Sequence, residues 1–403
     1  MDHQEEGYTY KPFFQKLYQL QKRPIHFSGS SLEEWNAFRP EAVQRLKTLL
    51  GWHICWAAEW EINGGPVDLA PVLLEEREET DRIIRKMSIQ TLPGVRMPFW
   101  ILIPKTYASS QGDEREESTG QKQPAGLGNG TEQERNAGQG QSAGKRFKTM
   151  LCLPAHGSNK DVVAGITTCP EVAEKLCQTP KEAYGREFCR REYVAICPDL
   201  SGFGERQEPT AREDCAFSAQ PPKKNPLGSS CAKLSQTAEA LGLSLAGLES
   251  WDLKKLLDFC GTLPFVDAGH IGCAGFSGGG LNTMWIAALD ERIRLAVISG
   301  YVHGYYNSIL ETHLCACNFV PGLWNAADLP DIASLIAPRP LFVENGREDP
   351  ESGPEGIADP TEQVRKIRSV YRLFGAKKLV EQSVPEGTHA WYGTCYDFVD
   401  RLL

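Results

Sequence analysis

One short stretch combines a nucleophile with the turn residues that would expose it. Gly275-Phe276-Ser277-Gly278-Gly279 has the pattern G-x-S-x-G; it follows the apolar run Ile271–Ala274, and apolar residues at helical spacing begin at Leu281. This order predicts a strand, a sharp turn and a helix, with Ser277 presented above the end of the strand. Glycine is expected at both ends of the motif because side chains there would collide, and the start of the helix would stabilise negative charge. A purely structural glycine-rich turn is the alternative interpretation.

A serine hydroxyl becomes a good nucleophile only when a base removes its proton. In this arrangement the partners follow along the chain in the order serine, acid, histidine. Three histidines lie downstream, His303, His313 and His389. Only His389 comes after the last expected strand and before a C-terminal helix, so we expect it to be the general base. A surface histidine is the alternative.

The acid is expected in the loop that follows the predicted strand Leu341–Glu344. That loop, residues 345–350, reads Asn-Gly-Arg-Glu-Asp-Pro. Its Asn-Gly pair is expected to form a turn, and Pro350 restricts the backbone where the chain leaves the loop. We assign Asp349 as the acid, with Glu348 as its nearest competitor, whereas Glu344 comes too early, within the strand. The acid would hold the imidazole in the correct tautomer and stabilise imidazolium. A solvated loop carboxylate is the alternative for either residue.

An oxyanion hole needs two backbone donors. The first is expected to be the amide of Gly278, directly after the nucleophile, and the second should come from the loop after the strand Met150–Leu153. In that loop the amide of His156 is the first candidate and that of Gly157 the second. The imidazole of His156 is expected to be structural.

The segment His313-Leu314-Cys315-Ala316-Cys317 superficially suggests a metal site. Its spacing differs from the usual C-x(2–4)-C zinc pattern, and no second Cys/His pair answers it along the chain. We therefore expect neither a metal nor another cofactor.

From residue 147 onward, short apolar runs alternate with helix-like stretches such as Glu171–Arg190, Leu245–Cys260 and Thr361–Phe374. This alternation predicts a mostly parallel, twisted sheet with helices on both faces. Residues 86–105 alternate with period two around Pro93-Gly94, which is typical of a β-hairpin. The predicted parallel strands are Met150–Leu153, Tyr193–Cys197, His270–Ala274, Leu295–Ile298, Pro340–Glu344 and Lys378–Gln382.

Composition divides the chain into parts. Residues 1–85 are expected to form an N-terminal helical extension or cap, and residues 86–403 the main domain. Within it, the Gly-, Gln- and Ser-rich stretch 108–145 predicts a disordered insertion, and residues 301–330 a lid. In the lid, Tyr305, Tyr306 and Trp324 could face an acyl or sugar group or pack in the core. Asp199 and Arg206 are expected to form an internal pair.

The chain has 403 residues and a net charge of -9, which argues against nucleic acid and anionic membranes as partners. It has neither a secretory signal pattern nor an apolar stretch of membrane-spanning length. Its 13 scattered cysteines predict reduced thiols and a cytoplasmic location. The expected partner is a small-molecule ester, and a homo-oligomer is compatible with the sequence.

From about residue 86 the chain resembles the dienelactone-hydrolase and acetyl-xylan-esterase-like branch of the α/β-hydrolases. The resemblance implies the α/β-hydrolase fold and a metal-independent carboxylic ester hydrolase, and some relatives remove acetyl groups from sugars. Dienelactone hydrolases carry a cysteine nucleophile where this chain has Ser277. The motifs that carry the resemblance are Ala155-His156-Gly157, Pro198-Asp199, Gly202–Arg206, Val266-Asp267, Ile271–Gly280, Asn318–Gly322, Ile336–Leu341, Asp349 and His389.

These features favour a serine esterase that cleaves short-chain esters through an acyl-enzyme. A serine peptidase of the prolyl-oligopeptidase type is an alternative, although about 85 N-terminal residues are too few to build a propeller. An acyltransferase would use the same intermediate. A non-catalytic binding protein on a hydrolase scaffold is the third alternative, because fold alone does not establish function.

Overall fold

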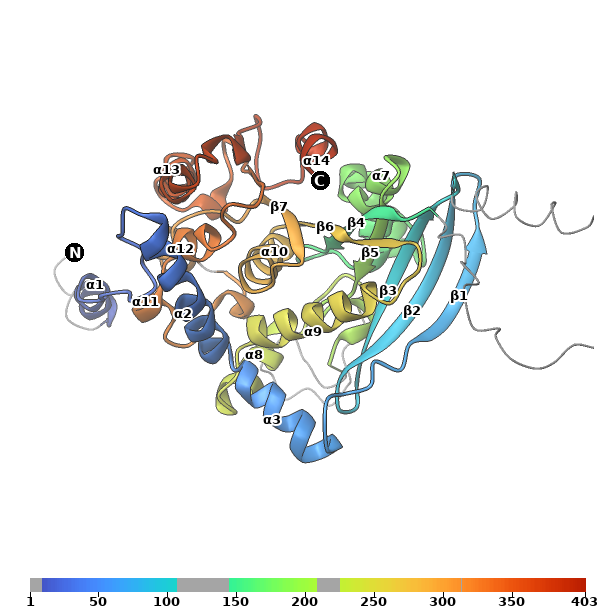
Figure 1. Ribbon diagram of the computed structural model, residues 1–403, viewed down its shortest axis with the longest axis horizontal. Coiled ribbons are helices and arrows are strands. Elements are labelled where there is room, and N and C mark those ends of the chain that lie inside the picture. Colours follow the sequence, from blue (N-terminus) through green and yellow to red (C-terminus); the bar gives the residue numbers. More distant parts are fainter. Residues whose placement is uncertain (1–8, 107–144, 209–224, 313) are drawn as a thin grey trace, which may run out of the picture.

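A nine-stranded sheet with the order β1-β2-β3-β5-β4-β6-β7-β8-β9 forms the centre of the molecule (Figure 1). The computed structural model describes residues 9–106, 145–208, 225–312 and 314–403. The strands β1 to β3 are joined to each other and to β5 by antiparallel pairing, and the other pairs are parallel. The strands are β1 Val72–Glu78, β2 Arg82–Leu92, β3 Val95–Pro104, β4 Phe147–Leu153, β5 Val194–Pro198, β6 Val266–Phe276, β7 Ile293–Ser299, β8 Leu341–Glu344 and β9 Val380–Ser383.

Helices cover both faces of this sheet, as the sequence predicted (Figure 1). The larger core contains buried residues of α2, α3, α9, α10, α12 and α13, and the smaller one contains those of α5, α7 and α14. The helices are α1 Lys11–Gln19, α2 Leu32–Leu50, α3 Trp52–Asn63, α5 Lys160–Ala164, α6 Pro170–Gln178, α7 Tyr184–Arg190, α8 Cys231–Ala240, α9 Leu245–Cys260, α10 Gly278–Leu289, α11 Leu323–Ala326, α12 Leu329–Ser334, α13 Ala358–Leu373 and α14 Tyr396–Leu402.

The parallel register aligns the carboxyl ends of four central strands. Leu153 of β4 pairs with Gly275 of β6, Phe276 pairs with Ser299 of β7, and Ser299 pairs with Glu344 of β8. The loops that follow these strands therefore emerge at one edge of the sheet. In open α/β sheets this edge is where ligands bind.

The N-terminal segment is joined to the main core. A capping box between Ser31 and Glu34 starts α2. Trp52 of α3 donates a hydrogen bond to Ser250 of α9 at 3.0 Å. The helical part of residues 1–85 ends at Asn63, and β1 and the start of β2 already belong to the sheet. The edge strand β1 lacks a buried face, so its sequence carried no strand pattern.

The hairpin predicted at 86–105 is confirmed, because β2 and β3 pair in antiparallel fashion over this range. The predicted insertion at 108–145 lies, apart from Lys145, outside the described residues. The predicted lid contains a π-helix at Tyr306–Leu310, a 3-10 turn at Ala316–Asn318 and α11. Of the helices that the structure describes, none has both the length and the apolar character needed to cross a membrane.

Candidate active site

Ser277 occupies a strained turn between β6 and α10. Its φ is +54° and its ψ is -117°, in a region that residues with side chains rarely adopt. A Cβ on Gly275 would lie 2.2 Å from the carbonyl oxygen of Gly279, and one on Gly279 would lie 2.0 Å from that of Leu153. Only glycine therefore fits at these two positions, which is the steric reason inferred from the sequence.

His389 and Asp349 meet at the same edge of the sheet. The Nδ1 atom of His389 and the Oδ2 atom of Asp349 are 2.8 Å apart, and the Asp349 side chain is 2% exposed. The other oxygen of Asp349 accepts the amide of Glu351 at 2.9 Å. Glu348, the competing acid, is exposed to solvent. The structure therefore brings Asp349, and not Glu348, to the imidazole.

The imidazole of His389 lies beside the residue that precedes Ser277. Its ring centroid is 4.6 Å from that of Phe276, and a Cβ on Gly300 would lie within 3.0 Å of both rings. The Nε2 atom is buried and has no hydrogen-bond partner among the described residues. No hydrogen bond to another described residue therefore engages the second nitrogen of the ring.

Glu351 is a site residue that the sequence analysis missed. Its Oε1 atom lies 3.5 Å from Nε2 of His389. Burial raises the pKa of Glu351. The charge of Asp349 adds to this increase, and that of His389 opposes it. Burial also opposes the charged form of His389, but Asp349 and Glu351 outweigh it and raise the pKa of His389 above its ordinary value. The only sequence feature that could have indicated Glu351 is its position two residues after Asp349.

The loop of residues 154–158 packs against the nucleophile turn. A Cβ on Gly278 would lie 2.7 Å from Nδ1 of His156, so this imidazole rests on the start of α10. Gly157 has a φ of +69°, which turns the loop. Among the described residues, the backbone amides of His156 and Gly278 donate no hydrogen bond. The His156 ring therefore lies beside Gly278, the residue that follows Ser277.

Glu344 ends β8 and holds the chain segment that follows His389. Its carboxylate accepts hydrogen bonds from the amides of Tyr392 and Thr394 and from the hydroxyls of Thr394 and Ser299, at 2.6 to 3.0 Å. The sequence placed Glu344 inside the strand, too early for the acid, and the structure gives it this supporting position.

The predicted pair of Asp199 with Arg206 is wrong in its side-chain contacts. The Nζ atom of Lys160 is 3.0 Å from Asp199 Oδ2, and the guanidinium of Arg206 is 2.6 Å from Asp252. Arg206 reaches only the backbone oxygen of Asp199, at 3.3 Å. Lys160 begins the helix after the 154–158 loop. It is 39 residues from Asp199 in sequence, so no local pattern indicated this pair.

The two other downstream histidines are not brought to Asp349. His303 is buried without a hydrogen-bond partner among the described residues, and burial lowers its pKa to about 4. His313 lies outside the described residues. Tyr305 stacks on Trp324, and both line a cavity of about 320 Å³ together with Tyr18 of α1. Ser277, Asp349 and His389 are not in the lining of this cavity.

Comparison with known proteins places the chain in a family. The model of the Abhydrolase family matches residues 141–352, more than half of the chain. YtaP of Bacillus subtilis (strain 168), provisionally named a hydrolase, is 31% identical over 225 residues, which are 55% of this chain and 66% of YtaP, just under two thirds of that protein.

Two solved structures share the fold at low sequence identity. A Bacteroides fragilis NCTC 9343 protein, provisionally named an acetyl xylan esterase, has a TM-score of 0.68 at 17% identity, covering 94% of this chain and 82% of that one. A glucuronoyl esterase from Solibacter usitatus has a TM-score of 0.57 at 14% identity, covering 93% of both chains. The fold is the predicted α/β-hydrolase fold, and the protein is a member of the Abhydrolase family.

Proposed function

We propose that the protein is a serine carboxylic ester hydrolase that acts on short-chain esters, including acetylated sugars, through an acyl-enzyme. One observation carries the proposal: the buried Asp349 carboxylate holds Nδ1 of His389, whose free Nε2 lies next to the Ser277 turn. This is the arrangement of acid, base and nucleophile that acyl transfer requires. The esterase names of structures with the same fold agree with this chemistry.

In the proposed first step, Ser277 Oγ bonds to the ester carbonyl carbon while Nε2 of His389 takes the serine proton. The tetrahedral intermediate collapses, the C–O bond to the alcohol breaks, and His389 returns the proton to the leaving oxygen. Water then attacks the acyl-enzyme with His389 again as base, and the acid and Ser277 are released. Asp349 keeps the imidazole oriented and stabilises the imidazolium at each stage.

The oxyanion of the intermediate would be held by the amides of Gly278 and His156. The proximity of the His156 ring to Gly278 supports this pair over one that uses Gly157. Loss of one such donor costs about 3 kcal/mol in the barrier. The start of α10 adds a favourable dipole at the same position.

We also propose that residues 86–403 form the catalytic unit, that the preceding helices support it, and that residues 301–330 cover the site. The contact of Cys317 with His156, at 3.2 Å, supports the covering role because it joins this segment to the oxyanion loop. The cysteines of the described residues form no disulfide, which favours a reducing, cytoplasmic compartment.

The test is hydrolysis of p-nitrophenyl acetate, butyrate and octanoate by the wild-type protein and by Ser277→Ala. Ser334→Ala is the matched control, because Ser334 is buried but bonds only within α12. We expect the wild type and the control to cleave the short esters, and Ser277→Ala to lose on the order of 10⁴-fold or more. Acetylated xylo-oligosaccharides would then be tested as substrates.

The alternatives predict other results. Cleavage of peptide amides in preference to esters would identify a peptidase, and transfer of the acyl group to added alcohols without hydrolysis would identify an acyltransferase. If well-folded wild-type protein cleaves none of these substrates, the binding-protein interpretation replaces the proposal.

A further inference from the structure

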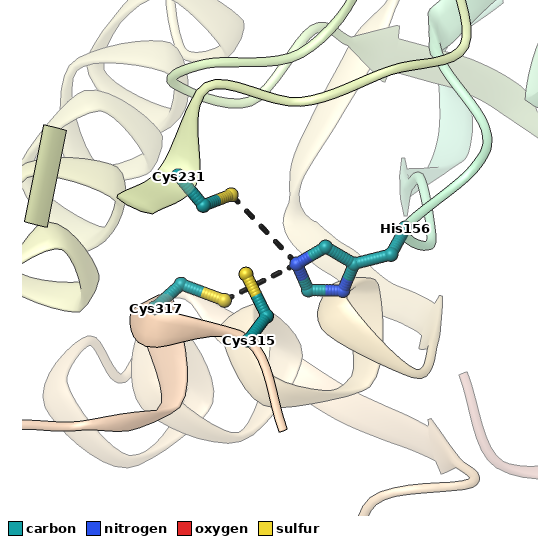
Figure 2. Close-up of side chains that lie close together, drawn as sticks. All are labelled: His156, Cys231, Cys315 and Cys317. Atoms are coloured by element: carbon teal, nitrogen blue, oxygen red, sulfur yellow. Dashed lines mark hydrogen bonds between the residues drawn. The ribbon is translucent and has the colours of Figure 1, made fainter. Parts of the chain in front are cut away.

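Three thiols and one imidazole converge beside the oxyanion loop. The Nε2 atom of His156 is 3.2 Å from Sγ of Cys317 and 3.7 Å from Sγ of Cys231. With Cys315, the four possible ligand atoms all lie within 4.8 Å of one another, and the sulfur atoms gather at the Nε2 edge of the ring (Figure 2). Among the described residues, no other group of His, Cys, Asp and Glu side chains meets this criterion.

The dimensions of the group are those of a four-ligand metal site. Zinc bonded to sulfur at about 2.3 Å and to nitrogen at about 2.0 Å in a tetrahedron places the ligand atoms roughly 3.5 to 3.8 Å apart. The recorded distances of 3.2 and 3.7 Å need only small shifts to reach this geometry. Three cysteines and one histidine are also a usual ligand set of structural zinc.

Burial and ligand type favour a structural zinc ion. Cys231 and Cys317 are 1% and 2% exposed. Soft thiolate ligands select zinc over hard cations.

We propose that His156, Cys231, Cys315 and Cys317 bind one zinc ion. The four protein ligands leave no open position for substrate, so the ion is structural and takes no part in ester cleavage. It ties together the loop after β4, the first residue of α8 and the 3-10 turn Ala316–Asn318. Because Nδ1 of His156 rests on Gly278, the ion also fixes the loop that carries the proposed oxyanion donor. The assignment of zinc does not depend on the esterase proposal.

The sequence could not reveal this site. Only Cys315 and Cys317 are close in the chain, at a spacing that is unusual for zinc, whereas His156 and Cys231 are separated by 75 residues and Cys317 lies 161 residues from His156. The absence of a second ligand pair near residue 315 led to the expectation of no metal. In the folded chain, His156 and Cys231 come from two other segments and complete the group.

The first experiment measures zinc, iron and copper in the full-length protein purified without chelator or affinity metal. We expect about one zinc per chain in the wild type and in Cys260→Ala, a matched control at a buried cysteine at the end of α9. We expect less than a tenth of that in Cys317→Ala and in Cys231→Ala. Circular dichroism checks that each variant is folded.

A second experiment needs no variant. Zinc is removed from the wild type with a chelator under reducing conditions, and Co²⁺ is added while the visible spectrum is recorded. One equivalent of Co²⁺ should give the intense bands of tetrahedral thiolate coordination, and Zn²⁺ should displace it and raise the unfolding temperature. Removal of zinc should lower the esterase activity, whereas a covalent serine label should still attach to Ser277.

Several outcomes would overturn the proposal. These are wild-type protein without zinc that also fails to bind Co²⁺, equal zinc contents in Cys317→Ala and Cys260→Ala, or iron or copper in place of zinc. A disulfide between two of these three cysteines in protein purified without reductant would likewise replace the metal site by a redox pair.

Discussion

The Oε1 atom of Glu351 lies 3.5 Å from Nε2 of His389, the nitrogen that faces away from Asp349. The imidazole therefore lies between two carboxylates, one on each nitrogen. Asp349 orients the ring through a hydrogen bond. Glu351 is too far for a normal hydrogen bond but close enough to favour the imidazolium that forms during acyl transfer.

Glu351 should set the pH dependence of the reaction. The pKa of His389 is raised above 6.5, because the effects of Asp349 and Glu351 exceed the opposing effect of burial. Since the base must be unprotonated, activity should fall as the pH drops through this raised pKa. Glu351→Gln removes one of the charges, so the acid limb of the kcat/KM profile should move to lower pH.

Glu348→Gln is the control for this shift, because Glu348 lies in the same loop but is exposed. Its profile should coincide with that of the wild type. A Glu351→Gln profile that does not move, or moves to higher pH, would show that Glu351 does not act on the imidazole.

Substitutions of Asp349 and of Glu348 distinguish the catalytic acid from its neighbour in the loop. Asp349→Asn should lower kcat by about 10⁴-fold, because an amide favours the wrong imidazole tautomer. Glu348→Gln should leave kcat within about twofold of the wild type, as expected for an exposed side chain without a contact at the site. Steady-state rates on p-nitrophenyl acetate decide the matter, and the reverse order of effects would make Glu348 the acid.

The buried pair of Lys160 and Asp199 should stabilise the region behind the oxyanion loop. Burial opposes the charge on Lys160, but Asp199, Asp161 and Glu205 outweigh it and raise the pKa of Lys160. Asp199→Asn leaves part of this charge uncompensated and should cost about 3–5 kcal/mol in the free energy of unfolding.

The double variant Lys160→Met/Asp199→Asn should be more stable than Asp199→Asn alone, since it also removes the part of the Lys160 charge that Asp199 compensated. Urea unfolding of the single and double variants tests this. Strictly additive losses would mean that the two side chains are not coupled.

The parts of the molecule that were predictable are those with local signals. The nucleophile turn is specified by five consecutive residues between a buried strand and a buried helix, and the parallel sheet by repeated apolar runs. The stretch Glu171–Arg190 was less simple, because Pro180 ends α6 and a second helix, α7, follows.

The parts that were not predictable depend on contacts between distant segments. The pair of Lys160 with Asp199, the position of Glu351 and the group around His156 each require the loops of separate strands to meet at one edge of the sheet. No pattern within a single segment encodes such a meeting.

The most direct test of the central claim is covalent labelling with a fluorophosphonate, followed by intact-mass measurement and peptide mapping. We expect one adduct per chain, on Ser277, formed in step with the loss of esterase activity. His389→Ala should slow labelling strongly, and Ser277→Ala should not be labelled. An adduct on another residue, or full esterase activity in Ser277→Ala, would contradict the assignment of Ser277 as the nucleophile.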